Sequence, residues 1–539
     1  MLIDRRSLLQ ASILGAGMLS VPGLAAALQS RGFSHGVASG EPSARSVLLW
    51  TRFVADSDRK LRVEVARDAR FRKIVAGAEA LASPERDHTA KVVVSGLSPN
   101  RWYFYRFIAP DGSISRTGRT RTLPEGAVDQ FGLALFSCSN LPFGYFNAYS
   151  HAAAREDLDL AVHVGDYVYE YQRGVYPDPK SAIDGRVIEP AHEILTLADY
   201  RLRYASYRLD PDLQRLHARM PMIAQWDDHE SANDSWRDGA ENHQSDTEGS
   251  WSARKAIAER VYREWMPVSD DYWSSYQIGQ LATLFKVETR LVARSAPLDL
   301  VAVVRAGGDV DQAVRKFRDE QWRDPARTLM GPEQEHWLQA GLLESKRNGT
   351  RWQILAQQVV MGEVLMPQQI AGWLRSDSPT SMRQYVQLGI AAARNGVPFN
   401  FDSWGGFPQA RDRLLRAALS ANADLLVLSG DSHNAWGQNL AVDGASAGVE
   451  FAGHSVTSPG YEKFAPQISR DEFAAVMRGA NPGLAYAELA RRGYVSLILR
   501  PTQAEGRWHF MRTVAQRDPS VEETRTMTVR AGQRKFAEA

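Results

Sequence analysis

The sequence has almost no cysteine, almost no net charge and no long apolar run beyond its first segment. Cys138 is the only cysteine in 539 residues, which excludes an intramolecular disulfide framework. A formal charge of +1 gives no reason to expect a nucleic-acid partner or an acidic membrane surface. No internal repeat of solenoid period is visible, so a repeat array is excluded as well.

The composition that is present is that of an ordinary globular protein. Hydrophobic residues make up 44% of the chain and charged residues 24%. A chain of 539 residues is longer than a single hydrophobic core usually organises. We therefore expect two or more domains.

The first 30 residues have the pattern of a twin-arginine signal peptide. Asp4-Arg5-Arg6-Ser7-Leu8-Leu9 supplies the paired arginines, a mild apolar stretch follows over residues 11–19, and Ala25-Ala26-Ala27 offers a cleavage site. The apolar stretch is too short to span a bilayer stably; the alternative is a membrane-anchoring helix. We predict export by the twin-arginine machinery and a periplasmic or secreted mature protein without a transmembrane segment.

The pattern of the mature chain changes near residue 124. Short apolar or alternating runs over residues 31–123 predict a small all-β sandwich domain, with strands at 46–51, 61–65, 89–94 and 102–107. The Pro- and Gly-containing stretch 124–130 predicts a linker. Residues 131–515 predict one α/β catalytic domain, and residues 516–539 predict a polar C-terminal tail.

Strand-like and helix-like segments alternate within the catalytic domain, which favours an α/β architecture. The expected strands are residues 131–136, 160–164, 222–225, 352–356, 425–429, 494–499 and 508–513. The expected helices are residues 199–207, 251–265, 332–343 and 409–420. A charged insertion at 301–324 interrupts this pattern, and the sequence assigns it no role.

Four loops that follow expected strands carry residues able to bind metal ions. They are Ser137-Cys138-Ser139-Asn140, Gly165-Asp166-Tyr167-Val168-Tyr169, Trp226-Asp227-Asp228-His229-Glu230 continuing to Asn233, and Gly430-Asp431-Ser432-His433. In open α/β sheets, ligands bind at the carboxyl ends of the strands. The four loops are therefore predicted to meet at one rim.

The residue types in these loops indicate two kinds of cation. Asp228, Asn233 and Asp431 offer oxygen atoms, which suit Ca²⁺ or Mg²⁺. Cys138, Tyr169 and His433 are ligand types of a transition metal, which we interpret as ferric iron. The two oxygens of Asp166 allow it to bridge two ions. Metal pairs about 3.5–4 Å apart clamp a phosphoryl group, so the pattern predicts a metal-dependent phosphoester hydrolase.

Each of these features also has a simpler explanation. A lone buried cysteine is usually a small inert hydrophobic residue, and the Asp431 loop could be a plain turn. The Trp226-Asp-Asp-His-Glu segment could cap a helix. Two arginines considered below also have simpler explanations: Arg254 could lie on a solvated helix face, and Arg290 could be an ion-pair partner in the core. Four such loops at four strand ends favour the metal site.

Several segments together resemble the alkaline phosphatase D family, exported enzymes of the metallophosphatase superfamily related to purple acid phosphatases. The resemblance runs from about residue 33 to residue 513. Gly36-Val-Ala-Ser-Gly-Glu-Pro42 and Leu49-Trp-Thr-Arg52 are similar to the family's amino-terminal sandwich. The catalytic motifs that match are Gly165-Asp-Tyr-Val-Tyr-Glu170, Trp226-Asp-Asp-His-Glu230, Leu329-Met-Gly-Pro-Glu-Gln334, Asp402-Ser-Trp404 and Gly430-Asp-Ser-His433.

The resemblance implies a two-sheet αββα metallophosphatase sandwich, preceded by the small all-β sandwich, and a site with one Fe³⁺ and two Ca²⁺. It assigns iron to Cys138, Tyr169 and His433, the bridging position to Asp166, and calcium to Asp228, Asn233 and Asp431. It also implies that His229 acts beside the scissile phosphate and that Arg254 grips phosphate oxygens. Glu288-Thr-Arg290 departs from the family's usual Asp-Thr-Arg, and Asn140 and His454 remain candidate substrate contacts without an assigned role.

The expected reaction is attack of a metal-bound hydroxide on the phosphorus of a small-molecule or lipid phosphate ester. In this scheme His229 and Arg254 hold the developing charge, and His229 protonates the leaving alkoxide. The alternatives are a phosphodiesterase or phospholipase-like enzyme that uses the same site, or a non-catalytic exported protein that binds phosphate or metal.

Overall fold

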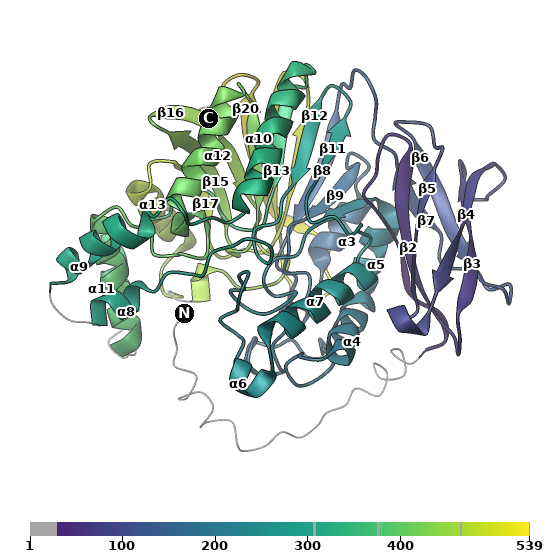
Figure 1. The fold of residues 1–539 in the computed structure, drawn as a ribbon, viewed down its shortest axis with the longest axis horizontal. Coiled ribbons are helices and arrows are strands. Elements are labelled where there is room, and N and C mark those ends of the chain that lie inside the picture. Colours follow the sequence, from purple (N-terminus) through teal and green to yellow (C-terminus); the bar gives the residue numbers. More distant parts are fainter. Residues whose placement is uncertain (1–29, 306–308, 375–377, 379, 464–465, 538–539) are drawn as a thin grey trace.

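Three β-sheets form the framework of the computed structural model, which describes residues 30–305, 309–374, 378, 380–463 and 466–537 (Figure 1). The twin-arginine motif and the cleavage site predicted for residues 1–30 lie outside the described residues. Among those described, no helix combines the length and the apolar character that a membrane crossing requires.

The largest sheet has nine strands and contains the first three strands of the catalytic domain at its centre. In spatial order the strands are β20 (Val521–Arg530), β19 (Gln503–Met511), β18 (Gly493–Leu499), β8 (Phe131–Phe136), β9 (Leu160–His163), β10 (Met222–Ala224), β1 (Gly32–Gly40), β2 (Ser46–Val54) and β5 (Thr89–Ser95). β8, β9 and β10 run parallel to one another, so their carboxyl ends share one edge.

The second sheet has seven strands, and the third has four. The seven-stranded sheet runs in the order β11 (Ser274–Ile278), β12 (Ala282–Lys286), β13 (Trp352–Ala356), β14 (Leu425–Ser429), β16 (Ala445–Ala452), β15 (Ala435–Val442) and β17 (Leu484–Glu488). The four-stranded sheet runs in the order β4 (Ile74–Ala82), β3 (Arg59–Ala66), β6 (Trp102–Ile108) and β7 (Gly118–Arg121).

The two large sheets pack against each other through their inner faces, and helices cover their outer faces. Leu133 and Val162 of one sheet and Ile354 and Leu426 of the other belong to the same apolar cluster between the sheets. The nine-stranded sheet is covered by α3 (Asn147–Ala154), α4 (Leu197–Arg208), α5 (Pro211–Arg219) and α7 (Trp251–Trp265). The seven-stranded sheet is covered by α10 (Gly331–Arg347) and α12 (Pro408–Ser420). This arrangement is the predicted αββα sandwich.

The central strands are buried on both faces, which explains their continuous apolar runs. β8, β13 and β14 begin and end at the predicted residues, as does α7. The expected strand 508–513 is wrong in position, because β19 spans Gln503–Met511. The first half of β19 alternates between buried and partly exposed residues, so its sequence lacks the continuous apolar run that marks a fully buried strand.

The amino-terminal sandwich is joined to the catalytic domain by a continuous sheet. Gly40 of β1 pairs in parallel with Met222 of β10, so β1, β2 and β5 extend the nine-stranded sheet. The Trp50 indole also donates a hydrogen bond to the backbone carbonyl of Glu264 at 2.8 Å. The core of the sandwich lies between these strands and the four-stranded sheet. The division at 124–130 therefore marks a change along the chain and not a break in the sheet.

The polar tail expected over residues 516–539 instead contains a strand. β20 pairs antiparallel with β19 along its whole length and forms the edge of the nine-stranded sheet. Its sequence, Val-Glu-Glu-Thr-Arg-Thr-Met-Thr-Val-Arg, is polar because most of its side chains face solvent. Backbone pairing, which side-chain hydrophobicity does not report, makes this segment a strand.

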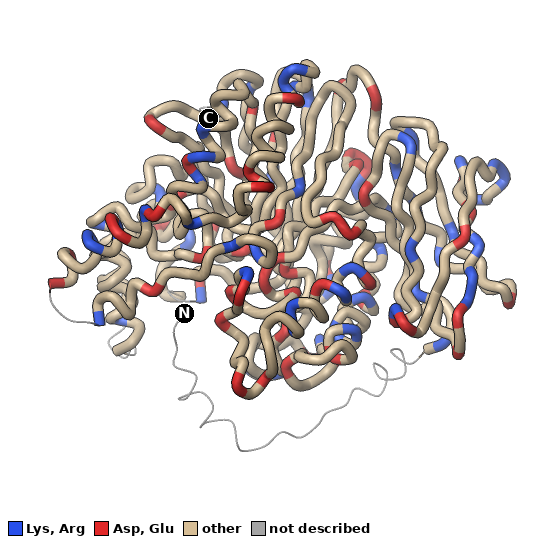
Figure 2. The backbone as a smooth tube through the Cα atoms, viewed as in Figure 1, with Lys and Arg blue, Asp and Glu red and all other residues tan. Residues whose placement is uncertain are grey.

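The insertion expected at 301–324 forms part of a helical subdomain. α8 (Leu300–Arg305) and α9 (Val310–Phe317) pack with α11 (Thr380–Arg394) around Val314, Phe317 and Leu388. The short helix α6 (Ser245–Glu248) and the helix α13 (Arg470–Ala480) complete the α-helices of the described residues. In Figure 2, basic and acidic residues are both scattered along a mostly uncharged tube, in keeping with the net charge of +1.

Candidate metal centre

The four loops singled out in the sequence meet at one rim between the two large sheets. β8, β9 and β10 are neighbours in one sheet, and β14 belongs to the other. Gly430, directly after β14, lies so close to the loop after β8 that a Cβ atom on it would be 2.4 Å from the Cβ of Ser137. This close approach requires glycine and brings the ligand-bearing loops of the two sheets together.

Four of the predicted ligands have a left-handed backbone. The φ angles are 58° at Cys138, 55° at Asp166, 63° at Asp431 and 61° at His433. Such angles are uncommon for residues other than glycine and cost free energy that the surrounding structure must supply. These angles occur in the loops that follow β8, β9 and β14, which indicates that the strained backbone serves to direct the candidate ligands.

A thiol, a carboxylate, an imidazole and a phenol form the first group. The ligand atoms of Cys138, Asp166 and His433 lie within 4.8 Å of one another. The Tyr169 hydroxyl donates to Asp166 Oδ2 at 3.1 Å and lies 3.4 Å from His433 Nε2. His433 Nδ1 lies 2.9 Å from the carbonyl oxygen of Pro459, which orients Nε2 towards the group.

Two further groups share members with the first. Asp166, Asp228 and His229 form one, and Asp227, Asp228 and Asp431 form the other, each with ligand atoms within 4.8 Å. Asp166 and Asp228 therefore connect three adjacent groups into one centre. The sequence analysis selected Asp228 but not Asp227; the adjacent pair of aspartates in the motif was the available signal.

Three carboxylate oxygen atoms in this centre are available to bind cations. Asp166 Oδ1, Asp227 Oδ2 and Asp228 Oδ1 are buried and have no hydrogen-bond partner among the described residues. A buried carboxylate oxygen without a partner is costly unless a cation or a proton satisfies it. Together with the thiol, phenol and imidazole, these oxygens make a donor set suited to a soft or borderline metal beside hard cations.

The electrostatics of the centre also favour cations. Burial raises the pKa of the Cys138 thiol and of the Tyr169 phenol well above their ordinary values, and the charge of Asp166 raises both further. Burial raises the pKa of Asp227 to about 7, against the opposing effect of Arg290. Burial also lowers the pKa of His433 to about 3, which keeps this imidazole neutral as a metal ligand must be. A bound cation would stabilise the ionised acids.

Arg290 is the buried cation that the protein itself supplies. Its side chain is inaccessible to solvent and contacts four carboxylates, those of Asp227, Asp402 (2.7 Å), Asp431 (3.4 Å) and Asp228 (3.7 Å). Its interpretation as an ion-pair partner agrees with these contacts, which also place it at the edge of the metal centre.

Glu288, the departure from the family's usual aspartate, serves the backbone near Arg290. Its carboxylate accepts from the backbone N–H groups of residues 290, 291 and 292 and from the Trp226 indole, at 2.7–3.0 Å. Both carboxylate oxygens of Glu288 thus accept hydrogen bonds, and the longer side chain is compatible with the position of Arg290.

Glu170 orients His229 and was not singled out by the sequence analysis. His229 Nδ1 lies 2.7 Å from Glu170 Oε2, while Glu170 Oε1 accepts from Asn242 Nδ2 at 2.6 Å. Burial lowers the pKa of His229, but Asp228, Asp166 and Glu170 outweigh burial and raise it well above its ordinary value. The acidic neighbours of His229 therefore favour its protonated form. The acidic residue that ends Gly165-Asp-Tyr-Val-Tyr-Glu170 was the available signal.

Replacing Glu170 by glutamine is expected to lower kcat for phosphate-ester hydrolysis about 10- to 100-fold, because the second partner of a site histidine sets its orientation and charge. Loss of the carboxylate lowers the pKa of His229, so the alkaline limb of the kcat profile should move to lower pH. Steady-state rates across pH measure both effects. Glu505→Gln on β19, which pairs with Arg507, is the control; equal profiles for both variants would contradict the assignment.

Arg254 does not contact any of the three groups in this structure. Its guanidinium is buried and donates to the Tyr200 hydroxyl, to the carbonyl of Asn242, and to the carboxylates of Glu193 and Glu248, at 2.9–3.1 Å. The solvated helix face considered for it is wrong, because its side chain is 1% exposed. Hydrogen bonds connect Arg254 to His229 through Asn242 and Glu170, and connect it through Tyr200 to Ser231, two residues after His229. Its contact with phosphate remains a prediction.

Three other sequence candidates make hydrogen bonds with part of their polar groups, whereas Asn140 Oδ1 and His454 Nδ1 are buried without a hydrogen-bond partner among the described residues. The backbone N–H of Asn233 donates to Glu170 Oε1 at 2.9 Å, and its side-chain amide donates to Glu241 at 3.2 Å. His454 Nε2 lies 3.1 Å from the carbonyl oxygen of His509. Asn140 Nδ2 donates to the carbonyl of Tyr176 at 3.4 Å. The calcium role of Asn233 stays a prediction, and neither Asn140 nor His454 gains an assigned role.

Replacing Gly165 by alanine is expected to impair the centre directly. A Cβ atom there would lie 2.3 Å from the Cβ of Asp227 and 2.5 Å from its backbone nitrogen, and φ is +111°. The segment carrying Asp227 and Asp228 must move, at a cost of about 1–3 kcal/mol. Denaturation midpoints and hydrolysis rates test this. Gly112→Ala, at φ +86° with no neighbour within 4 Å, isolates the backbone effect; equal losses in both variants would contradict the steric argument.

Comparison with known proteins agrees with this geometry. Residues 133–508 match the family described as PhoD-like phosphatase, and residues 19–124 match its N-terminal domain. Alkaline phosphatase D of Bacillus subtilis (strain 168) is 33% identical over 510 residues, which cover 90% of this chain and 78% of that protein.

Solved structures show the same relationship. The structure of PhoD superposes with a TM-score of 0.76 at 31% identity, covering 94% of this chain and 92% of that one. Purple acid phosphatase PPD1 from yellow lupin (Lupinus luteus) seeds gives a TM-score of 0.53 at 13% identity, covering 92% and 74%, which shows a shared fold.

The fold and the site thus define a phosphoric ester hydrolase of the metallophosphatase class. Within that class, the chain belongs to the PhoD-like phosphatase family. The resemblance inferred from the sequence motifs is confirmed, and the family implies metal cofactors. The alternative of a non-catalytic binding protein finds no support in these relationships.

Proposed function

We propose that this protein is an exported phosphatase of the alkaline phosphatase D type with one Fe³⁺ and two Ca²⁺. The observation that carries the proposal is the position of Asp166, which belongs both to the group with Cys138 and His433 and to the group with Asp228 and His229. One carboxylate shared between a soft-ligand group and an acidic group is what adjacent unlike cations require.

In this proposal Cys138, Tyr169 and His433 would hold iron, and Asp166 would serve both the iron and a calcium. Asp228, Asp431 and Asn233 would hold calcium, and Asp227, whose carboxylate lies close to those of Asp228 and Asp431, would be an additional oxygen donor. When bound, the cations supply Lewis-acid stabilisation of the phosphoryl oxygens and activation of the attacking water.

The chain's own residues orient the ester and handle the proton. His229, kept charged by its acidic neighbours and oriented by Glu170, faces the centre as a donor to the phosphoryl group and then to the leaving alkoxide. Arg254 positions this assembly through Asn242 and Glu170. Arg290 forms ion pairs with Asp227 and Asp431 and so restricts the positions of their carboxylates.

Export by the twin-arginine route completes the proposal. It rests on the paired arginines Arg5 and Arg6 and on the ligand set, because this route carries proteins already folded around their cofactors. The mature protein would act in the periplasm or outside the cell, on monoesters or on diesters; both need the same clamp, and a phosphodiesterase or phospholipase-like activity is the second candidate.

Elemental analysis of the purified protein, combined with hydrolysis of 4-nitrophenyl phosphate and bis(4-nitrophenyl) phosphate, tests the proposal. We expect about one iron and two calcium per chain, and loss of hydrolysis on calcium chelation that added calcium restores. Tyr169→Phe should remove any visible phenolate-to-iron absorption band. Hydrolysis without iron would refute the ferric assignment alone. No hydrolysis of either ester in the presence of both metals would refute the proposal.

A further inference from the structure

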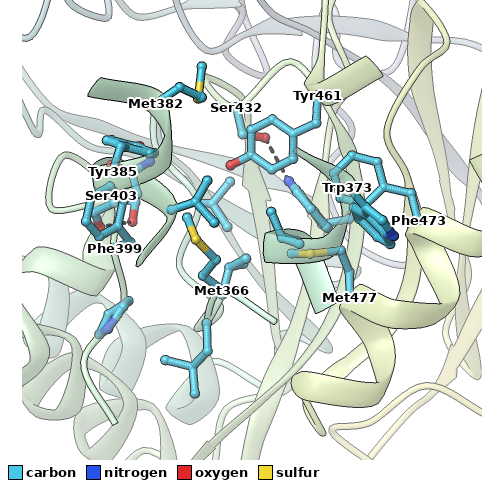
Figure 3. A pocket seen from close by; sticks show the side chains of 18 of the residues that line it. Met366, Trp373, Met382, Tyr385, Phe399, Ser403, Ser432, Tyr461, Phe473 and Met477 are labelled. Carbon is cyan, nitrogen blue, oxygen red and sulfur yellow. Dashed lines mark hydrogen bonds between the residues drawn. The ribbon is translucent and has the colours of Figure 1, made fainter. Parts of the chain in front are cut away.

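An apolar cavity of about 320 Å³ lies next to the metal centre (Figure 3). Its walls come from the segment after β13, from the short helix Gln368–Trp373, from α11, from the loop around residues 398–403 and from α13. Cavities that bind small organic groups measure about 300–1,000 Å³. The volume is therefore sufficient for a compact organic group.

The side chains that line this cavity are mostly apolar and deformable. Three methionines and several aromatic rings face it, among them Met366, Met382, Met477, Phe399, Trp436 and Phe473. Figure 3 shows Met382, Tyr385 and Phe399 on one side and Trp373, Phe473 and Met477 on the other. Methionine and aromatic side chains adapt to hydrocarbon of varied shape. The lining selects against a sugar or a charged group.

The cavity wall contains residues of the ligand loops themselves. Ser432, between Asp431 and His433, lines the cavity, and its hydroxyl accepts a hydrogen bond from the Trp436 indole at 2.8 Å. Ser403 lines it too, next to Asp402, whose carboxylate pairs with Arg290. The cavity wall and the metal centre are therefore adjacent along the backbone at these two serines.

Tyr461 lines the cavity beside Ser432 (Figure 3). The backbone N–H of Tyr461 donates to Asn434 Oδ1 at 3.0 Å, which ties this residue to the loop that follows His433. Burial raises the pKa of the Tyr461 hydroxyl to about 12, and the charge of Asp431 contributes. Ser432 and Tyr461 of the cavity wall are thus connected to the segment 431–434, which carries the candidate ligands Asp431 and His433.

We propose that this cavity binds the apolar part of the alcohol esterified to phosphate, so that the substrates are phosphate esters of aliphatic or aromatic alcohols. This inference rests on the proposed function. In the reaction water forms a P–O bond, the ester P–O bond breaks, and the leaving oxygen takes a proton as the free alcohol. The cavity holds that alcohol's hydrocarbon while the centre holds the phosphate.

The first test compares ethyl, butyl, hexyl and octyl phosphate with glycerol 3-phosphate as the polar control, using the full metal-loaded chain. Each methylene moved from water into the cavity should raise kcat/KM roughly three- to fourfold until the cavity is filled. We expect octyl phosphate to exceed ethyl phosphate by about a hundredfold or more. 2-Naphthyl phosphate is compared with phenyl phosphate, because the two phenolic leaving groups are similar in acidity. A gain for octyl over ethyl phosphate but not for 2-naphthyl over phenyl phosphate identifies an aliphatic occupant, and the reverse identifies an aromatic one; no gain in either pair overturns the inference.

Variants of the lining separate this cavity from a general surface effect. Ile370→Trp fills the cavity and should lower kcat/KM for octyl phosphate at least about tenfold more than for ethyl phosphate. Met366→Ala enlarges the cavity and should move the optimal chain length upward. Leu343→Trp, at an exposed position on α10, is the matched control. Equal effects of Ile370→Trp on both esters would overturn the inference.

Binding measured without catalysis distinguishes failure of this inference from failure of the proposed function. Calorimetric titration of the metal-chelated protein with 1-octanol should show saturable binding that Ile370→Trp removes and Leu343→Trp preserves. Loss of all ester hydrolysis with retained octanol binding would refute only the proposed function. Hydrolysis that is indifferent to chain length, without octanol binding, would refute only the inference drawn from the cavity.

Discussion

Replacing Asp166 by asparagine is expected to lower the rate of phosphate-ester hydrolysis by about a thousandfold or more while the protein stays folded. The physical reason is that Asp166 is the carboxylate shared by two of the three ligand groups, so one substitution weakens both. Asparagine has nearly the same shape and tolerates the positive φ angle of 55° at this position. Hydrolysis rates and metal content of the purified variant measure the effect.

The control for this prediction is Asp443→Asn. Asp443 also has a positive φ angle, 51°, but lies at the surface and pairs with Arg416. It reports any effect of the Asp-to-Asn change on a left-handed backbone. Near-native activity of Asp443→Asn with loss of activity and metal in Asp166→Asn is the expected result. Full activity in Asp166→Asn would remove the basis of the proposed centre.

Replacing Arg290 by methionine is expected to destabilise the protein by about 3–5 kcal/mol. Arg290 is wholly buried and contacts the carboxylates of Asp227, Asp228, Asp402 and Asp431. Methionine fills similar space but leaves these charges without their buried cation. Chemical denaturation of the metal-chelated protein measures the loss. Asp402 keeps its second partner, the buried Arg294, whereas Asp227 pairs with Arg290. The double variant Arg290→Met/Asp227→Asn should therefore recover part of the loss, because the charge of Asp227 is then gone.

Arg416→Met is the matched control for the loss of an arginine. Arg416 pairs with Asp443 and Asp412 at the surface, with 46% of its side chain exposed. Exposed ion pairs contribute only about 0–1 kcal/mol. A loss below about 1 kcal/mol in Arg290→Met, comparable with this control, would show that the four carboxylates do not depend on Arg290.

Much of the fold and most of the candidate ligands were predictable from local pattern. β8, β13, β14 and α7 occupy their expected residues, because short apolar runs and helical periodicity are properties of neighbouring residues. The four loops were found for the same reason, since each follows such a strand. The edge strand β20 was missed because its pairing with β19 leaves no apolar signature.

The residues that surround the candidate ligands could not be predicted from local pattern. Arg290 and Asp431 are 141 positions apart, and Glu170 and Asn242 are 72 apart. No spacing rule connects such pairs. Arg254 illustrates the same limit, because its helix was placed correctly while its partners Glu193 and Glu248 lie on other segments.

The sequence by itself determined several central strands and helices, the family motifs and the chemical types of candidate ligand that follow four of the strands. Only the tertiary structure decided that Asp227 and Arg290 belong at the centre and that an apolar cavity adjoins the segment carrying Asp431 and His433. The physical reason is one of range. Local hydrophobic pattern fixes secondary structure, whereas electrostatic neighbours and cavities depend on contacts between distant segments that form only when the two sheets pack together.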